Sequence, residues 1–508
     1  MKGRVKIRLE PVGRSLRVER GASLHGALAE HGVEFPCGGH GWCRGCRVRV
    51  LNGELEQTED PTEILSPAQL AAGWRLACRA RVHDDVTLEI GQWDCVVLAD
   101  DSAFVFEPRA GLGIAVDVGT TTLVAQLVDF RGGRVLAVRS ALNPQIVCGG
   151  DVMSRIDAAL SGGEQGRLVD VLRGTVGRMV GELVAAAAAS GRDLDRVVLA
   201  GNTVMQHFFC GRDVAPLATW PFTLAKAGAC HLRAGDLGWP VAGDTPVTFL
   251  PCLGGFVGSD LLGGLLAIGI HRSEAPCVLI DLGTNGEIVV GNRDRILCAS
   301  TAAGPAFEGG GIGMGMRATT GAIHRVRAQG GGFHASVLGG GAARGICGSG
   351  LVDAAAAALE LGLLEPSGRL AGGNSSLTVA EPVAITQRDI RQLQLAKAAV
   401  AAGLRILRRR FGTAACAAAP VYLSGAFGNY VDRASASSIG LVAAAGAQVR
   451  PAGNTALLGA KIALLGGNSA GYDFDAIRAR VEHVALASDP EFEDVYIEEM
   501  PFPDPRRR

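Results

Sequence analysis

The chain has 508 residues and a net charge of −1, from 49 basic and 50 acidic side chains, and 48% of its residues are hydrophobic. A chain of this length is too long to fold around a single compact hydrophobic core, so at least two or three domains are predicted. The balanced charge argues against a nucleic acid or a membrane surface bound through bulk charge. The 72 glycines do not follow a G-X-Y period, which excludes collagen, and the apolar content argues against disorder.

The N-terminal segment, MKGRVKIRLEPVGRSLRVER, lacks the apolar stretch of a secretory signal peptide. No run approaches the roughly 18 apolar residues that a membrane-spanning helix needs. We therefore expect a cytoplasmic protein with no membrane partner and no nucleic-acid partner. Most of the 13 cysteines are single residues in apolar surroundings, which suits buried side chains in a reducing compartment.

Residues 1–93 are expected to form a small α+β domain of the β-grasp type. The segments VKIRLEP and SLRVER alternate apolar and polar residues, as two paired strands do. The segment SLHGALAEHG then predicts a short helix that starts at a serine and stops at a glycine. Two further strands are predicted, in RVRVLNGE and in VTLEI. Residues 94–110 show no clear period and are interpreted as a linker.

Four cysteines of this domain, Cys37, Cys43, Cys46 and Cys78, have the spacing C-x5-C-x2-C followed by a distant cysteine. A disulfide pair is disfavoured in the cytosol, and structural zinc favours two C-x2-C knuckles where only one is present. The plant-type [2Fe–2S] spacing, C-x4-C-x2-C with a distant cysteine, differs by one residue. A [2Fe–2S] cluster held by these four thiolates is therefore favoured. The segment resembles ferredoxins whose first spacing is C-x5-C, as in the adrenodoxin type.

A second pattern occurs twice in the rest of the chain. The segment GIAVDVGTTTLVAQLVDF contains Asp117, and the segment CVLIDLGTNGEIVVG contains Asp281. Both run apolar strand, Asp-x-Gly-Thr and apolar strand. A supersecondary unit repeated at domain spacing indicates two similar halves. We therefore expect a duplicated α/β fold, with one half over residues 111–275 and the other, which includes a C-terminal tail, over residues 276–508.

Each Asp-x-Gly-Thr turn can present backbone amides and hydroxyls to phosphate oxygens. Each aspartate can hold Mg²⁺ directly or through water. Two facing copies would clamp a triphosphate from both sides, which predicts ATP and Mg²⁺ as ligands. The alternative, two ordinary hairpin turns, is disfavoured because both copies have matched strands around them. The candidate phosphate-binding residues are Gly119, Thr120, Thr121, Thr122, Gly283, Thr284 and Asn285.

A third loop completes this set of motifs. The segment VYLSGAFGNYVDR predicts a strand, a turn with Gly425 and Gly428, and the start of a helix. Small residues there would let an adenosine lie against the backbone. The two phosphate motifs and this adenosine motif, in this order, resemble the actin, sugar-kinase and Hsp70 superfamily. The resemblance implies an actin-like ATPase that follows the β-grasp domain.

Two glutamates are candidates for positioning an attacking water. Glu287 lies in TNGE, and Glu308 lies in a glycine-rich loop that also contains Gly304, a candidate nucleotide contact. Either glutamate could instead cap backbone amides. Asp117, Asp281 and Glu287 are the candidate catalytic residues.

The combination of motifs resembles the reductive activators of corrinoid proteins. The sequence also carries NPQ at 143–145, GGDVMSRI at 149–156, GNTVMQH at 201–207 and GICGSGLVD at 345–353. The resemblance covers nearly the whole chain. It implies an ATP-hydrolysing enzyme that passes one electron from its [2Fe–2S] cluster to the corrinoid protein of a methyltransferase system and returns inactive Co(II) to Co(I). It also implies an upstream electron donor, a flavoprotein or another ferredoxin, and leaves room for a homodimer.

Three rival interpretations stay open. A small-molecule kinase with an Fe–S sensor domain predicts phosphoryl transfer without cobalamin. Activators of radical dehydratases or of benzoyl-CoA reductase share the ATPase fold, but they hold a [4Fe–4S] cluster between subunits, and the four-cysteine domain disfavours them. An inactive actin-like scaffold is disfavoured by the intact Asp117 and Asp281. The activator family carries a further domain between its ferredoxin and ATPase parts, whereas only residues 94–110 separate them here.

Overall fold

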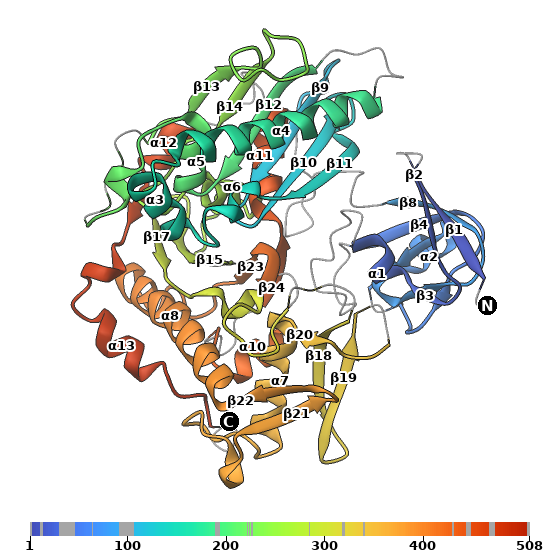
Figure 1. Cartoon of the computed structure of the whole chain (residues 1–508), viewed down its shortest axis with the longest axis vertical. Helices are drawn as coiled ribbons and strands as arrows, with labels where there is room; N and C mark the ends of the chain where they lie inside the picture. The colour runs from blue at the N-terminus through green and yellow to red at the C-terminus, as the bar shows by residue number, and fades with distance from the viewer. Residues whose placement is uncertain are drawn as a thin grey trace.

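The structure is a computed structural model that describes residues 3–10, 14–29, 46–62, 64–90, 106–187, 194–220, 222, 224, 227–283, 285–316, 318, 321–338, 341–428, 431–442, 449–466 and 473–504. Figure 1 shows a small N-terminal domain on the right, in blue, beside two larger parts. The upper part is mostly cyan and green, and the lower part runs from yellow to red. Each of the three parts is built on its own β-sheet.

The N-terminal domain contains a five-stranded sheet in the order β2-β1-β8-β4-β6. β1 pairs antiparallel with β2 and parallel with β8, so the first and last strands of the domain lie side by side. Alternate residues such as Ile7 and Leu9 are buried, as expected for a sheet with one face on the core. The predicted β-grasp arrangement is confirmed. Its elements are β1 (Arg4–Glu10), β2 (Arg14–Glu19), β3 (Ala22–Ser23), α1 (Leu24–Ala29), β4 (Arg47–Asn52), β5 (Glu56–Gln57), α2 (Pro67–Ala71), β6 (Trp74–Leu76), η1 (Ala77–Arg79), β7 (Ala80–Val82) and β8 (Val86–Ile90).

The first half of the duplicated α/β fold contains a six-stranded sheet in the order β11-β10-β9-β12-β14-β13. The strands β9, β10 and β11 are antiparallel neighbours, and β12 and β14 continue from β9 in parallel. Ile114 of β9 packs with α4 on one face of the sheet, whereas Ala115 packs with α6 and α11 on the other. The elements are β9 (Leu112–Val118), β10 (Thr122–Asp129), β11 (Arg134–Leu142), η3 (Pro144–Val147), α3 (Val152–Ser161), α4 (Gln165–Ala187), β12 (Leu194–Gly201), α5 (Thr203–Cys210), η5 (Ala215–Leu217), β13 (Cys230–Arg233), β14 (Pro246–Phe249) and α6 (Ser259–Ala267).

The second half repeats this topology in the order β24-β23-β15-β16-β17-β25. The strands β15, β16 and β17 are antiparallel neighbours, and β23 and β24 continue from β15 in parallel. Five strands of each half therefore share one connectivity, which confirms the predicted duplication. The elements of this sheet and the helices after it are β15 (Cys277–Leu282), β16 (Gly286–Gly291), β17 (Ile296–Thr301), α8 (Gln387–Phe411), β23 (Val421–Ser424), α9 (Gly425–Gly428), α10 (Arg433–Ser438), β24 (Val449–Gly453), α11 (Thr455–Gly466), α12 (Phe474–Arg478), β25 (Val481–His483), η8 (Leu486–Ser488) and α13 (Phe492–Glu498).

An insertion between β17 and α8 forms the bottom of the molecule in Figure 1. It carries a three-stranded sheet, a two-stranded sheet and the buried helix α7. Its elements are η6 (Pro305–Glu308), β18 (Ala322–Gln329), β19 (Gly332–Val337), β20 (Gly345–Ile346), α7 (Gly348–Glu360), η7 (Ala371–Gly373), β21 (Ser376–Ala380) and β22 (Val383–Thr386). Within the described residues, no helix is both long and apolar enough to cross a membrane.

The helix α11 belongs to the second half in sequence but packs against α6, β9 and β12 of the first half. The two helices approach at glycines, because a Cβ atom on Gly459 would lie 2.1 Å from Cα of Gly263. No larger residue fits such a contact without moving a backbone. The sheet of the first half is therefore completed on one face by a helix from the far end of the chain.

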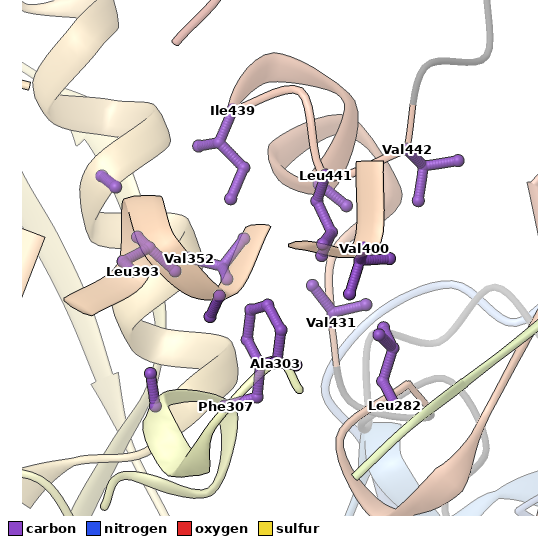
Figure 2. Packing of buried hydrophobic residues seen from close by; sticks show 14 of the residues in the cluster. Leu282, Ala303, Phe307, Val352, Leu393, Val400, Val431, Ile439, Leu441 and Val442 are labelled. Atoms are coloured by element: carbon purple, nitrogen blue, oxygen red, sulfur yellow. The ribbon is translucent and has the colours of Figure 1, made fainter. Parts of the chain in front are cut away.

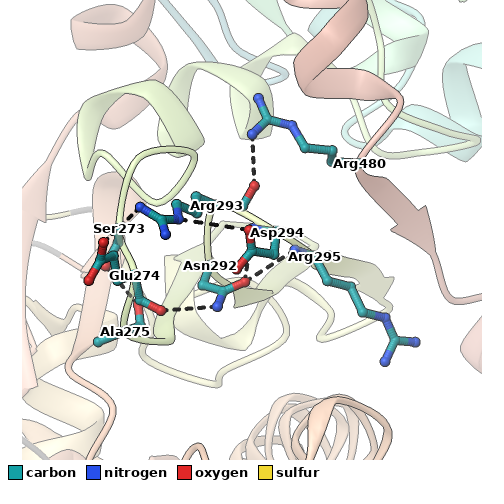
Figure 3. Close-up of polar contacts among 8 residues, drawn as sticks. All are labelled: Ser273, Glu274, Ala275, Asn292, Arg293, Asp294, Arg295 and Arg480. Carbon is teal, nitrogen blue, oxygen red and sulfur yellow. Dashed lines mark hydrogen bonds and ion pairs between the residues drawn. The ribbon is translucent and has the colours of Figure 1, made fainter.

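Polar contacts also hold the junction between the halves (Figure 3). The carboxylate of Glu274 accepts a hydrogen bond from Arg293 Nη1 at 2.8 Å, and its carbonyl accepts one from Asn292 Nδ2 at 3.0 Å. Arg480 donates to the carbonyl of Arg293 at 2.7 Å. Exposed ion pairs contribute only about 0–1 kcal/mol each, so these contacts mainly fix the connecting segment against the β16–β17 turn.

The N-terminal domain contacts both halves. Glu89 of β8 forms an ion pair with Arg134 of β11 at 3.7 Å. The ring of His25 in α1 lies edge-on to the ring of His324 in β18, with centroids 6.0 Å apart. Burial, followed by the charge of Arg325, lowers the pKa of His25 to about 4. The imidazole of His25 is therefore neutral at physiological pH.

Candidate functional site

Cys46 and Cys78 meet in the N-terminal domain, where their Sγ atoms lie 3.3 Å apart. Cys46 precedes β4, and Cys78 lies in the short turn η1 after β6. Pairing of β4 with β6, and a hydrogen bond from Ala77 N to Cys46 O at 3.0 Å, hold the two segments together. The two cysteines therefore converge as ligands of one cluster must. Cys37 and Cys43, the other two predicted ligands, lie outside the described residues.

The first Asp-x-Gly-Thr motif begins at Asp117, near the end of β9, and continues into the turn between β9 and β10. Gly119 N donates a hydrogen bond to Thr122 O at 3.1 Å, which closes the turn. A Cβ atom on Gly119 would lie 2.5 Å from that carbonyl oxygen, so the turn requires glycine. Thr120 and Thr121 at its tip are half-buried. The motif therefore forms a tight turn that requires glycine; its binding of phosphate stays a prediction.

Residues from three other segments hold this first loop in shape. Arg155 is fully buried and donates hydrogen bonds to the carbonyls of Thr120, at 2.7 Å, and Gly149, at 3.0 Å. Burial lowers its pKa to about 10, so it stays charged at neutral pH. Asn143 Nδ2 donates to the carbonyl of Gly119 at 2.9 Å. Asn202 Nδ2 donates to Thr120 Oγ1 at 2.8 Å.

These contacts give a role to the motifs NPQ, GGDVMSRI and GNTVMQH, for which the sequence alone suggested none. Each supplies one of the side chains, Asn143, Arg155 or Asn202, that hydrogen-bond to the first loop. A buried hydrogen bond to a charged group is worth about 1.5–3 kcal/mol. The guanidinium of Arg155 is therefore a strong determinant of the loop conformation.

The second motif forms the turn between β15 and β16. Gly283 N donates to Asn285 O at 3.1 Å, and Thr284 between them lies outside the described residues. Ser424 Oγ donates a hydrogen bond to Asp281 Oδ2 at 2.9 Å. Gly425 has a φ of +84°, and a Cβ atom there would lie 2.4 Å from Asp281 Oδ1. The adenosine motif and the second phosphate motif are therefore in direct contact.

Four carboxylates from both halves, Asp117, Asp260, Asp281 and Glu287, are linked by electrostatic interactions at these motifs. Burial, followed by the negative charge of Asp281, raises the pKa of Asp260 to about 7, and Asp117 contributes as well. Burial also raises the pKa of Asp281 to about 6. Glu287 lies opposite Asp281 in the β15–β16 pairing, and burial with the charges of Asp260 and Asp281 raises its pKa well above the usual range. Shifts of this kind concentrate at functional sites.

The loop after β17 and the adenosine motif share one apolar core. Phe307 stacks on Phe427 with ring centroids 4.6 Å apart, and Figure 2 shows Phe307 among the buried side chains around it. Gly304 has a φ of +75° with no atom near its Cβ position, so space remains beside it. A Cβ atom on Gly283 would lie 4.0 Å from Glu308 Oε1. Glu308 therefore borders the turn of the second motif.

The structure thus brings together the three predicted catalytic residues, Asp117, Asp281 and Glu287, and places Gly425 and Gly428 in α9 beside them. Sequence reasoning did not single out Asp260, whose pKa is raised by burial and by the charges of the aspartates of both motifs. One signal was available: Asp260 is the one charged residue of α6, whose sequence is SDLLGGLLA. A charge in a helix that is otherwise apolar is costly to bury and calls for a functional reason.

Three family profiles match the sequence. The profile described as a 2Fe-2S iron-sulfur cluster binding domain matches residues 7–83. The RACo middle region matches residues 112–273, the segment expected to form the first ATPase half. The C-terminal domain of RACo, the ASKHA domain, matches residues 275–508. The [2Fe–2S] domain and the ATP-binding fold are thereby identified.

Individual relatives match over most of the chain. The corrinoid activation enzyme RamQ of Eubacterium limosum is 38% identical over 420 residues, 77% of this chain and 70% of the relative. The reductase of the Co(II) methylated amine-specific corrinoid protein of Methanosarcina barkeri is 26% identical over 422 residues, 77% of each chain. The solved structure of a reductive activator for corrinoid, iron-sulfur protein has a TM-score of 0.68 and 25% identity, and covers 98% of both chains. None of these relatives favours the kinase or dehydratase-activator interpretation. The chain belongs to the RACo family, the reductive activators of corrinoid proteins.

Proposed function

We propose that this protein is an ATP-dependent reductase that returns the cobalt of a corrinoid methyltransferase protein from Co(II) to Co(I). One observation supports this most strongly. The chain joins the converging thiols of Cys46 and Cys78 to a carboxylate site assembled from both ATPase halves. An electron-carrier domain and a nucleotide site in one chain are what a driven one-electron reduction requires.

The N-terminal domain is proposed to hold a [2Fe–2S] cluster through Cys37, Cys43, Cys46 and Cys78. When bound, the cluster supplies one-electron chemistry. Plant-type centres have potentials near about −400 mV, and cob(II)alamin reduction to Co(I) demands a stronger reductant. For one electron, each step of about 59 mV is a factor of ten in equilibrium. Transfer to the corrinoid is therefore uphill and needs an energy source.

The ATPase halves are proposed to supply this energy. The first loop, at Gly119–Thr122, and the second, at Gly283 and Asn285, would bind the phosphates from opposite sides. Among the described residues, no three His, Cys, Asp or Glu side chains are arranged to hold a metal ion by themselves. Asp117 and Asp281 would therefore hold Mg²⁺ together with phosphate oxygens and water, as this ion prefers.

Asp260 is proposed as the group that orients the attacking water and accepts its proton. A general base works best when its pKa is near the operating pH, and the pKa of Asp260 is raised to about 7. Glu287 is one of the two alternatives that the sequence suggested, beside Glu308. Its pKa is raised well above the usual range, so its carboxyl is less able to accept a proton at neutral pH. We propose that Glu287 instead orders the site by hydrogen bonding.

Coupling between the two parts must arise from differential affinity. Nucleotide can shift the redox equilibrium only if it changes how tightly the protein binds the Co(II) and Co(I) forms of its partner. Contacts of the N-terminal domain with both halves, at Arg134 and at His324, give the nucleotide site a route to the electron carrier. A flavoprotein or a second ferredoxin is proposed as the electron donor, and a homodimer as the assembly. A cytoplasmic location stays a prediction.

The test is an anaerobic assay with the reconstituted protein, a low-potential reductant and a Co(II) corrinoid protein, followed at the Co(I) absorbance. We expect Co(I) to form with MgATP and not with MgADP. Asp281→Asn should abolish the ATP-dependent formation of Co(I). The control Asp294→Asn changes an exposed side chain and should behave as wild type. Formation of Co(I) at the same rate without ATP, or phosphorylation of a small acceptor in its place, would refute the proposal.

A further inference from the structure

The hydroxyl of Ser259 joins the start of α6 to the end of β12. Ser259 is the first residue of α6 and is 0% exposed. Its Oγ accepts a hydrogen bond from Gly201 N at 3.1 Å and donates one to Gly201 O at 3.1 Å. A hydroxyl has one donor and two acceptor sites, so this single side chain can bond to both backbone groups of Gly201. Apart from Asp260, it is the one polar side chain of α6, whose sequence is SDLLGGLLA.

Gly201 lies where β12 extends beyond one of its two neighbouring strands. The pairing of β12 with β14 ends at Leu199, whereas its pairing with β9 continues to Gly201. Buried backbone groups that have no strand partner need another one. Ser259 supplies that partner in place of a further residue of β14. The start of α6 and the end of β12 are therefore held together as one unit.

A close backbone contact adds to this hydroxyl bridge. A Cβ atom on Gly258, the N-cap of α6, would lie 2.4 Å from Cα of Asn202, so no larger residue fits there without moving a backbone. Asn202 follows Gly201 directly and is the N-cap of α5. Its Nδ2 donates a hydrogen bond to Thr120 Oγ1 at 2.8 Å. The contacts from α6 to the first Asp-x-Gly-Thr loop therefore run through two residues that are adjacent in the sequence.

We propose that Ser259 is a positioning residue for the first Asp-x-Gly-Thr loop, because it fixes Gly201 and thereby holds the side chain of Asn202 against Thr120. The inference rests on the proposed binding of nucleotide phosphates by this loop. Loss of the hydroxyl leaves Gly201 N without this partner and frees the turn between β12 and α5 to move. The hydrogen bond from Asn202 to Thr120 then weakens, and the outer phosphates bind a less ordered loop. The adenosine motif lies in the second half, so binding of the nucleoside part should persist.

The test compares two affinities of the reconstituted full-length protein, for a non-hydrolysable ATP analogue with Mg²⁺ and for AMP, by isothermal titration calorimetry. Absence of binding by the wild type would refute the ATPase function and, with it, this inference. In Ser259→Ala we expect binding of the ATP analogue to weaken about five-fold, the equivalent of one net hydrogen bond. AMP, which lacks the two outer phosphates, should bind within about two-fold of wild type. Equal weakening of both ligands, or unchanged binding of both, overturns the positioning role.

Ser349→Ala is the matched control for lost stability. It removes another buried hydroxyl, which donates to the carbonyl of His324 in the insertion at 3.0 Å. We expect a lower melting temperature and an unchanged ratio of the two affinities, and a ratio that shifts equally in both serine variants overturns the proposal. If Ser259→Ala does not fold, Ser259→Cys takes its place, because a thiol is a weaker donor and acceptor. A partial loss of the preference for the ATP analogue is then expected, and an unchanged preference overturns the proposal.

A double-mutant cycle tests the route through Asn202. Asn202→Ala should weaken binding of the ATP analogue about as much as Ser259→Ala does. Since both substitutions disturb the same contact with Thr120, the double variant should lose little more affinity than either single variant. Losses that add would show that Ser259 acts by another route, such as its neighbour Asp260, and would overturn the link to the loop.

Discussion

Asn454 donates a hydrogen bond from Nδ2 to Asp117 Oδ2 at 2.8 Å, across 337 positions of sequence. Ser424 makes the matching contact with Asp281, at 2.9 Å. Asn454 lies between β24 and α11, and Ser424 ends β23, so both phosphate-motif aspartates are oriented by the second half. The position of the Asp117 carboxylate therefore depends on how the two halves are packed together.

Replacing Asn454 by Ala should raise the Mg²⁺ concentration that ATP hydrolysis requires by about five- to ten-fold. The reason is that Asp117 loses a hydrogen bond of about 1 kcal/mol and is less well oriented. The measurement is ATPase activity against free Mg²⁺. Asn374→Ala, which removes only a local contact to Ala371 O, is the control and should not change the Mg²⁺ requirement. An unchanged Mg²⁺ dependence in Asn454→Ala would show that Asp117 does not need this partner.

Asp260→Asn should lower the kcat of ATP hydrolysis by about 10²- to 10⁴-fold, the range of general base catalysis. A base acts in its deprotonated form, and the pKa of Asp260 is about 7. Wild-type kcat/KM should therefore fall about ten-fold per pH unit below pH 7 and level off above it. The remaining activity of the variant should lack this acidic limb, and its nucleotide affinity should stay within a few-fold of wild type. If the fall in kcat/KM below pH 7 persists in Asp260→Asn, another residue accepts the proton.

Cys78→Ser should abolish the visible absorbance of the [2Fe–2S] cluster and the reduction of Co(II), because the cluster needs four thiolates. ATP binding should persist, since Cys78 contacts Cys46 and lies in a separate domain. Absorbance and iron content after anaerobic reconstitution are the measurements. Cys148→Ser changes a half-buried cysteine of the first half and should keep the full spectrum. A retained spectrum in Cys78→Ser would remove it from the ligand set.

The stability of Asp353→Asn relative to wild type should increase as the pH rises from 5 to 8. Asp353 is 2% exposed, and burial raises its pKa to about 7. The native state therefore binds more protons than the unfolded state between about pH 4 and pH 7, and wild-type stability falls as pH rises through that window. Two pKa values this far apart are equivalent to at most about 4 kcal/mol. Differences in melting temperature across this pH range, with Asp294→Asn as control, measure the effect.

The sequence predicted the parts of the site that are continuous in the chain. The two Asp-x-Gly-Thr turns, the adenosine motif and the strands around them are encoded by local patterns of apolar residues and glycine. The β-grasp strands were predicted for the same reason. The domain boundaries and the individual site residues remain predictions that mutation can test.

The sequence did not reveal the residues that act through distant contacts. The influence of Asp281 and Asp117 on Asp260 arises only in the folded chain, as does the hydrogen bond from Arg155 to the carbonyl of Thr120. Contacts between residues that are distant in sequence leave no periodic pattern in the sequence.

The sequence by itself determined the order of the modules, the cluster spacing, the duplication and the phosphate motifs, because backbone turns and amphipathic periods are local properties. Only the tertiary structure decided that the pKa of Asp260 is raised to about 7, because this pKa depends on burial and on the charges of Asp281 and Asp117. It also decided that α11 completes the first half, through glycine contacts that bring Gly263 and Gly459 together. Desolvation and charge interactions depend on distances in space, and those distances exist only once the chain has folded.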